Sequence, residues 1–448
     1  MTGTLRPVRA TFVTFGVFWG TWAVAATNIE RSLHLSTGGL GLLLSASIGA
    51  GGLAAAASGG LAERWGTGRF LSRTLLVWGA VLVVSAGVGA GGALVATLVL
   101  SMTTAGLVDM AMNAGAATAV AGDAARMMRF HALFNAGALL GAATCGALLR
   151  AGLSWRWTWV AVGASGLLLA ARIARAGPQT DAVVDTTALD GGGGAPEGAP
   201  DGILDAAAAS EPSGRSWLRS AAAIRSQGLV VLAFIFALTA MVEGGIDTFG
   251  VLYLRTHLAA GVVVGAGAYC VGQAIAVSTR GGAGGHIGRL GARWGLVLGA
   301  AVAALGLGLE AGSGHAAPAA VGLALAAGGI SLCWPLVMAV ASTVALGAPG
   351  RVPETSRAAV PSGAESGPGA TAAPLVAPGP APSRAVTPAA IVGALTAAGY
   401  AGWVAGPAVV GWVADAAGLS AGLLVLSSLA AVAAVVLTLI PARPAAVA

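Results

Sequence analysis

The chain has 448 residues, of which 56% are hydrophobic and only 9% are charged, and its mean hydropathy is +0.85. An ordinary soluble domain carries about 25% charged residues, so the composition excludes that class and indicates a polytopic membrane protein. The formal net charge is +6. Its arginines are spread over many segments without an aromatic-interleaved basic patch, which argues against a nucleic-acid partner.

Twelve long apolar stretches follow one another along the chain. A helix needs about 20 mostly apolar residues to cross a bilayer, because it satisfies its own backbone polar groups where water is absent. The stretches are continuous rather than alternating, which excludes strands. We expect an all-α membrane protein with spans centred near Phe18, Ile48, Val81, Val108, Leu140, Leu167, Ala240, Gly272, Leu305, Ile330, Val404 and Leu429.

All 23 basic residues are arginines, and their distribution predicts the topology. With the N-terminus inside, only Arg31, Arg150, Arg156 and Arg255 fall at outer helix ends, and the remaining 19 fall at cytoplasmic ends or loops. The positive-inside rule therefore predicts that both termini are cytoplasmic. No clear cleavage site follows the first apolar stretch, so we expect an uncleaved first span.

Two short charged stretches interrupt apolar runs at corresponding places, residues 59–69 after the second span and residues 284–293 after the eighth. Aligned on Glu63 and Gly288, they lie 225 residues apart in the 448-residue chain. This spacing is typical of a duplicated membrane protein. It predicts two pseudo-symmetric bundles of six helices.

The first charged stretch has the chemistry of a gate latch. Glu63, Arg64 and Arg69 lie at a helix end, where ion pairs can form in one conformation and break in another. Gly59 and Gly66 permit close helix approach and a tight turn. The alternative is a tight turn with basic anchors that obey topology. The second stretch has Gly288 in place of the acid and offers, for the same role, Gly284, Arg289 and Arg293.

Only three acidic residues are expected inside the predicted spans: Asp109 in the fourth, and Glu243 and Asp247 in the seventh. An ionised carboxylate at mid-bilayer is costly and needs a cavity, a partner or a proton. Asp109 and Asn113 share one helix face, as do Glu243 and Asp247. Burial and a second acid both disfavour the charged form. We predict proton coupling at Glu243, with Asp247 or Asp109 as partner or as acceptor of a solute hydroxyl. Water contact for Asp247 and helix pairing for Asp109 are the alternatives.

Amide and aromatic side chains in other spans add candidates for a central site. Amides and carboxylates bind polyol hydroxyls and aromatic faces bind sugar rings, while aromatics combined with acids suit cationic drugs. For each aromatic residue, packing or contact with the lipid interface is the alternative. The substrate-binding candidates are Asn113, Trp22, Asn28, Asn135, Gln273, Trp334, Tyr400 and Trp403.

Two segments are too polar or too irregular to span a membrane. Residues 1–177 are expected to form the N-terminal bundle and residues 228–448 the C-terminal bundle, joined by an acidic cytoplasmic linker at 178–227. The end of the linker contains a short basic segment around Trp217 that either lies on the inner leaflet or is solvated. Residues 348–387, rich in Pro, Ala, Gly and Ser, are expected to form a disordered cytoplasmic loop between the tenth and eleventh spans.

The motif Gly-x-x-x-Asp/Glu-Arg-x-Gly-x-x-Arg at 59–69, together with twelve spans in two halves, resembles the major facilitator superfamily over essentially the whole chain. A closer likeness is to the YbjJ-type branch, itself similar to the fucose permeases. Its motifs lie at 107–113, 130–137, 243–247, 253–255 and 399–407. The fifth span lacks the Gly-Pro pair typical of drug/proton antiporters, which disfavours multidrug efflux.

This resemblance implies a secondary transporter that moves a small polar solute, sugar-like or related, by proton-coupled alternating access. Pro335 and Pro407 would kink their helices as hinges. The alternatives are an efflux antiporter for drugs or metabolites and a non-transporting membrane sensor. No metal-ligand or nucleophile motif is present, so we expect no enzyme, no metal and no cofactor beyond the proton gradient. We expect a monomer in the bacterial cytoplasmic membrane, with the solute and the lipid bilayer as partners.

Overall fold

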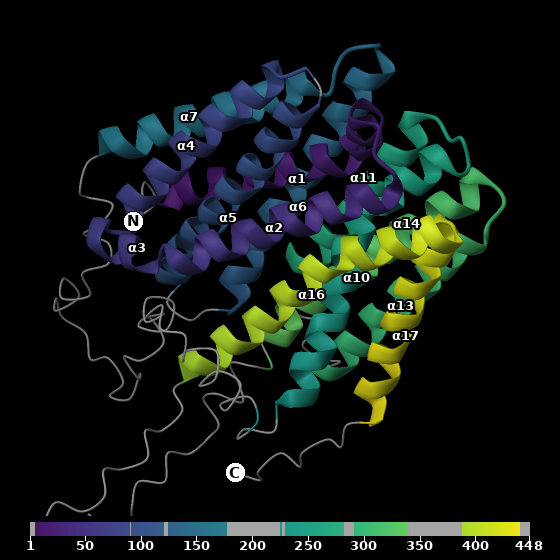
Figure 1. The fold of residues 1–448 in the computed structure, drawn as a ribbon. Helices are drawn as coiled ribbons and strands as arrows, with labels where there is room; N and C mark the ends of the chain where they lie inside the picture. Colours follow the sequence, from purple (N-terminus) through teal and green to yellow (C-terminus); the bar gives the residue numbers. More distant parts are fainter. Residues whose placement is uncertain are drawn as a thin grey trace, which may run out of the picture.

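The computed structural model describes residues 5–89, 91–120, 124–176, 225, 229–281, 291–338, 340 and 388–439, and these contain helices and no strand. The N-terminal half consists of α1 (Leu5–Leu33), α2 (Thr37–Ala57), α3 (Gly59–Trp65), α4 (Thr67–Gly87), α5 (Gly92–Val120), α6 (Ala124–Arg150) and α7 (Arg156–Ala176). The C-terminal half consists of α10 (Val230–Thr256), α11 (Val262–Gly281), α13 (Ala292–Gly312), α14 (Ala316–Ile330), α16 (Pro388–Ala417) and α17 (Leu419–Leu439). The halves lie side by side, the first in purple and blue and the second in teal to yellow (Figure 1).

Each expected span centre falls in a different long helix. Eleven of the described helices are long and apolar enough to cross a membrane, with the tenth span running from Ala316 through Met338. The apolar helix α16, with 30 residues, is the further long helix of the described part. The expected all-α architecture is therefore confirmed, with α3 as a short additional helix between α2 and α4.

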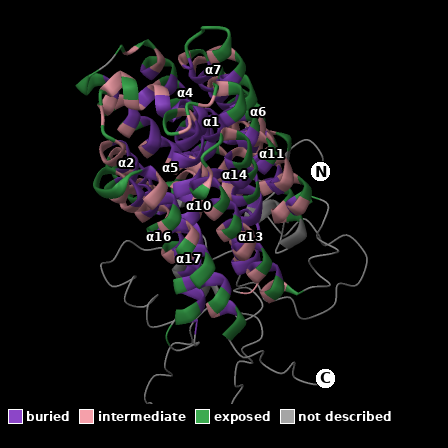
Figure 2. Cartoon of the chain, turned by 90° about the vertical axis from the view of Figure 1, so that its right-hand side faces the viewer, coloured by how far each residue is buried: buried purple, intermediate pink, exposed green. Residues whose placement is uncertain are grey.

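The surface of the bundle is apolar, as a lipid-facing surface must be. Figure 2 shows buried residues concentrated in the interior and exposed ones on the outer helix faces. Large apolar side chains are among the exposed ones: Leu53 is 75% exposed, Leu305 74% and Trp412 73%. A soluble protein rarely exposes so many large apolar side chains, so these faces fit a membrane protein.

The two halves pack their helices in the same way. Helix α1 packs on α6, and α10 packs on α16. Both contacts depend on glycine, because a Cβ on Gly141 would overlap the backbone of Val17 and one on Gly402 would overlap the backbone of Ala237. Small residues let helix backbones approach this closely. The most extensive contacts between the halves are made by α2 with α16, α6 with α11, and α1 with α10.

The turns that join consecutive long helices divide between two ends of the bundle. The short turns α1–α2, α4–α5, α6–α7, α10–α11, α13–α14 and α16–α17 lie together at one end, which we call the short-turn end. The start of α1 and the end of α17 lie at the opposite end, which we call the terminal end. The predicted topology places the short-turn end outside the cell.

The duplication is visible in the backbone at the terminal end. Gly66 precedes α4 with φ 78° and ψ 150°, and Gly291 precedes α13 with φ 77° and ψ 151°. These glycines are 225 residues apart, the spacing of the two charged stretches. Positive φ favours glycine because a Cβ would be strained there. The first stretch is not a tight two-residue turn, since residues 59–65 form α3 before the turn at Gly66.

Several predicted features lie outside the described residues. They include nearly all of the linker at 178–227, the whole loop at 348–387, Gly284 and Arg289. The side chain of Glu63 is likewise not described, so the latch of the first charged stretch remains a prediction.

Candidate substrate and proton site

A small cavity lies where α6 of the first half meets α10, α11 and α14 of the second. Its volume of about 20 Å³ has room for about one water molecule. Asn135, Gln273, Glu243 and Asp247, all predicted site residues, are among those that line it. The full lining is Phe134, Asn135, Glu243, Ile246, Asp247, Tyr269, Gln273, Ala327, Ile330 and Ser331.

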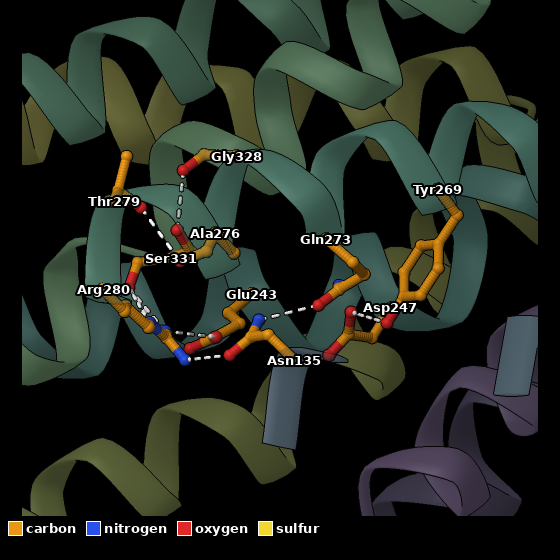
Figure 3. A network of polar contacts seen from close by, with 10 residues as sticks. All are labelled: Asn135, Glu243, Asp247, Tyr269, Gln273, Ala276, Thr279, Arg280, Gly328 and Ser331. Atoms are coloured by element: carbon orange, nitrogen blue, oxygen red, sulfur yellow. Dashed lines mark hydrogen bonds and ion pairs between the residues drawn. The ribbon is translucent and has the colours of Figure 1, made fainter. Parts of the chain in front are cut away.

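Arg280, near the end of α11, organises the polar groups beside this cavity (Figure 3). Its side chain is 5% exposed, and its Nη2 lies 3.8 Å from Oε1 of Glu243. Its Nη1 donates a hydrogen bond of 2.6 Å to Oδ1 of Asn135, on the other half. The amide of Asn135 in turn donates to Oε1 of Gln273 at 2.7 Å. The chain of contacts therefore joins α10, α11 and α6.

Pro335 explains why the carbonyl of Ser331 is free to accept hydrogen bonds from Arg280. In an unbroken helix the carbonyl of Ser331 would accept from the amide of residue 335, but Pro335 has no amide hydrogen. The helix breaks at Ser331 and Leu332. Arg280 donates from Nε to the free carbonyl oxygen of Ser331 at 2.9 Å and from Nη2 to the same oxygen. The predicted kink at Pro335 is thus a helix break that creates an acceptor.

Asp247 lies one helical turn from Glu243, on the other side of the amide pair (Figure 3). Its Oδ1 accepts a hydrogen bond of 2.9 Å from the hydroxyl of Tyr269. Tyr269 comes from α11 and is only 2% exposed. Glu243 and Asp247 therefore share a face of α10, as expected, but have different partners: an arginine for Glu243 and a tyrosine for Asp247.

Asp109 forms a second polar cluster between the halves. Asn113 donates from Nδ2 to its Oδ1 at 3.0 Å and to its backbone carbonyl at 2.9 Å. The hydroxyl of Tyr400, on α16, donates to Oδ2 across the interface. Tyr400 packs edge-on against Trp334 and Trp403, with ring centroids 5.7 and 6.4 Å apart. The predicted Asp109, Asn113, Trp334, Tyr400 and Trp403 thus come together.

Trp22 and Asn28 are not brought to the cavity. Trp22 is 1% exposed and stacks on Trp159 inside the N-terminal half. Asn28 lies near the short-turn end, where its Oδ1 accepts a hydrogen bond of 2.9 Å from Arg255. Arg255 also donates to the carbonyl of Val24 at 3.0 Å, so this contact joins α1 to α10.

A second cross-half contact lies at the same end of the bundle. Oδ1 of Asp415, on α16, accepts from the backbone amide of Gly38 at 2.9 Å, and Oδ2 accepts from the hydroxyl of Ser36 at 2.7 Å. A Cβ on Gly38 would overlap the Asp415 carboxylate, so a larger residue there would displace this side chain from its two partners. We call the Arg255 and Asp415 contacts together the short-turn latches.

The described arginines of the two charged stretches, at 59–69 and 284–293, lie away from the cavity and from the short-turn latches. Arg64 and Arg69 are exposed at the terminal end. Arg293 donates from Nε to the carbonyl of Leu437 at 3.0 Å and from Nη2 to that of Thr438 at 2.7 Å. Arg293 therefore joins the start of α13 to the end of α17 within one half.

Two buried charged residues, Glu310 and Arg280, were not among the site residues predicted from the sequence. Glu310 in α13 is 0% exposed, so the expectation of only three acids inside the spans is wrong. Arg280 stands near a helix end, where an arginine usually marks topology. One pattern in the sequence could have indicated Arg280: the polar residues Tyr269, Gln273 and Arg280 are spaced so that they share one face of α11. Nothing comparable pointed to Glu310. In the part of the chain that the structure describes, no three His, Cys, Asp or Glu side chains could hold a metal ion.

Apolar helices in two similar halves, with polar groups gathered at their junction, define a multi-pass membrane protein with a polar site between its halves. The chain belongs to the Major Facilitator Superfamily, whose family model matches residues 10–360. This membership assigns it to the transporters rather than the enzymes. No curated protein matches the chain in sequence.

Solved transporter structures share the fold at low sequence identity. The nucleoside transporter NupG is 13% identical, with a TM-score of 0.63 over 98% of this chain and 99% of that one. The human organic anion transporter MFSD10 is 15% identical, with a TM-score of 0.63 over 98% and 100% of the chains. A bacterial homologue of the human lysosomal transporter Spinster, solved inward-facing and unoccupied, is 15% identical, with a TM-score of 0.63 over 97% and 96%.

Proposed function

We propose that this protein is a secondary active transporter that moves a small polar solute, sugar-like or a related metabolite, by proton-coupled alternating access. The observation that carries the proposal is the placement of Glu243, Asp247 and Asp109 at the junction of the two halves. Acids inside a membrane mark proton or ion pathways, because burying them as permanent charges is costly. The amides Asn135 and Gln273 supply hydrogen-bonding groups beside two of these acids.

The arrangement of the halves supports the transport cycle. Transporters of this architecture rock one bundle against the other around a site at mid-membrane. The short-turn latches hold one end together with hydrogen bonds that have to break when that end opens. We infer that the short-turn end faces outside, that both termini are cytoplasmic, and that the protein works as a monomer in the bacterial cytoplasmic membrane without nucleic acid. The closer likeness to the YbjJ-type branch is part of this proposal and rests on the motifs of the sequence.

Efflux of a cationic drug or metabolite is the second candidate. Two carboxylates facing one arginine leave a net negative charge beside the cavity when both acids are ionised. The aromatic rings of Trp334, Tyr400 and Trp403 would also suit a cation. A solute with a positive charge would then compete with the proton for the same site.

The first test is proton flux in proteoliposomes that contain the purified protein and a pH-sensitive dye. Sugars, nucleosides, organic acids and cationic drugs would be screened, with the double variant Glu243→Gln/Asp247→Asn. We expect solute-dependent proton movement that the double variant abolishes and that Glu310→Gln, a buried acid away from the cavity, retains. Solute movement without protons would refute proton coupling. Exchange of external cations for internal protons would favour the efflux antiporter.

A further inference from the structure

The two acids of α10 have unequal surroundings, and Arg280 is the reason. A guanidinium group stays charged under all ordinary conditions. Its side chain is 5% exposed, so it requires an anion nearby, and Oε1 of Glu243 lies 3.8 Å away. If Glu243 took up a proton, Arg280 would become a buried charge without a counter-ion. Ionised Glu243 is therefore the stable partner of Arg280.

Arg280 makes its hydrogen bonds and its ion pair with groups other than Asp247. Two of its nitrogens donate to the carbonyl of Ser331, and a third donates to Asn135. Asn135 and Gln273 lie between Arg280 and Asp247, bonded to each other (Figure 3). These contacts fix the guanidinium on the Glu243 side of the cavity.

Asp247 is left with a hydroxyl as its partner. Tyr269 of α11 donates to Oδ1, and the carboxyl group lines the cavity. The charged groups that act on it are Glu243 on its own helix, which repels a second negative charge, and Arg280 of α11, whose ion pair is with Glu243. Asn135 of α6 and Ser331, directly after α14, face the same cavity and are neutral. An ionised Asp247 would add a negative charge without a counter-ion. The protonated carboxyl group is therefore the more stable form.

We propose that Glu243 and Arg280 are a permanent ion pair that positions the site, and that Asp247 is the carboxyl that gains and loses the transported proton. This inference rests on the proposed function and deepens it, since the sequence alone favoured Glu243. Except for Asn135, every group in the network belongs to the C-terminal half. The ion pair would therefore move as a unit when the halves rock, and of this network only the two bonds of Asn135, to Arg280 and to Gln273, would break.

Infrared difference spectroscopy tests the assignment without a solute. Purified protein is titrated in H₂O and D₂O, and the band of a protonated carboxylic acid is followed. We expect a titrating band that Asp247→Asn removes and Glu243→Gln retains. A band lost in Glu243→Gln but kept in Asp247→Asn would overturn the proposal, as would a wild-type protein with no titrating band. This readout stays valid even if the wild type transports none of the screened solutes, which would count against the proposed function alone.

Transport assays test the role of Arg280. We expect Asp247→Asn to lose proton movement by more than about tenfold while it still exchanges solute across the membrane. Arg280→Gln should lower transport by more than about tenfold, because it leaves Glu243 buried without a counter-ion. The double variant Arg280→Gln/Glu243→Gln should recover most of the transport, because it removes both charges. Recovery also shows that the variants fold. A double variant as inactive as Arg280→Gln, with an unchanged elution profile on gel filtration, would contradict the permanent pair.

Discussion

Glu310 is a buried acid without a hydrogen-bond partner. It is 0% exposed in α13, and neither carboxyl oxygen is bonded within the part of the chain that the structure describes. An unsatisfied buried polar group costs about 1–3 kcal/mol. Methionine has a side chain of similar volume to glutamate and carries no carboxyl group that would be left without a hydrogen bond.

We therefore expect Glu310→Met to stabilise the protein by about 1–3 kcal/mol and to leave transport unchanged. Thermal unfolding of the detergent-solubilised protein measures the first effect, and flux in proteoliposomes measures the second. Loss of transport in a stable variant would show instead that Glu310 takes part in the cycle.

Tyr400 contributes a single polar atom to the Asp109 cluster. Its hydroxyl donates to Oδ2 of Asp109 across the two halves, while its ring packs against Trp334 and Trp403. Tyr400→Phe keeps the packing and removes the hydrogen bond, so we expect solute transport to fall by about tenfold, in line with about 1–3 kcal/mol for a lost buried partner. Tyr253→Phe is the matched control, because that hydroxyl bonds to the carbonyl of Ala311 within the C-terminal half. Equal effects of the two variants would exclude a special role for Tyr400.

At the scale of the elements, glycines set the distance between paired helices. A Cβ on Gly141 would meet the backbone of Val17, whereas a Cβ on Gly52 in α2 would meet nothing within 4 Å. Forcing a methyl group into a close contact costs about 1–3 kcal/mol. An alanine in an open helical position stabilises by about 0.8–1.0 kcal/mol relative to glycine.

We expect Gly141→Ala to destabilise the protein by about 1–3 kcal/mol and Gly52→Ala to be neutral or stabilising. Thermal unfolding of both variants gives the comparison. Similar melting temperatures for the two would mean that α1 and α6 can separate without penalty, against the packing seen here.

Pro335 interrupts the helix directly after α14, because it has no amide hydrogen to donate to the carbonyl of Ser331. Pro335→Ala would return an amide donor to the carbonyl of Ser331, which would then compete with the guanidinium of Arg280. We expect weaker positioning of Glu243 and a loss of transport, without a large loss of stability, because the helix itself would improve. Pro407→Ala is the comparison, since α16 runs unbroken through Pro407. A larger loss of transport in Pro407→Ala would contradict this role for Pro335.

For the whole molecule, the short-turn latches determine how readily that end opens. Each latch depends on one charged side chain, Arg255 or Asp415, that bonds to neutral groups of the other half. Arg255→Gln/Asp415→Ala should therefore populate the state that is open at the short-turn end. Cys270 of α11 is a free cysteine whose thiol lies 3.5 Å from the carbonyl oxygen of Leu139 on α6, at the junction of the halves. We expect thiol reagents to label Cys270, kept as the sole cysteine, about tenfold faster in this variant.

The labelling experiment has a control at the opposite end. Arg293→Gln removes a contact within one half, from α13 to α17, and should leave the labelling rate unchanged. Unchanged labelling in the latch variant would show that other contacts keep the short-turn end closed.

Much of the architecture could be predicted from the sequence. Continuous apolar runs of span length can only be helices in a bilayer, and the 225-residue spacing of the charged stretches reappears as the matching backbone of Gly66 and Gly291. Helical spacing also indicated that Glu243 and Asp247, and likewise Asp109 and Asn113, share a face. These properties depend on local geometry, which the order of residues determines directly.

Only the tertiary structure decided which faces meet. Spacing along α11 cannot tell that Arg280 reaches a carbonyl freed by a proline just beyond α14. Nor can spacing tell that Trp22 turns into its own half while Tyr400 crosses to Asp109. Such contacts depend on how each helix is rotated about its axis and on which glycines let backbones approach. The sequence by itself thus determined the helices and their duplication. Packing between the helices decided that Glu243 has a counter-ion and Asp247 does not, because the charge environment of a buried acid is made by its neighbours in space.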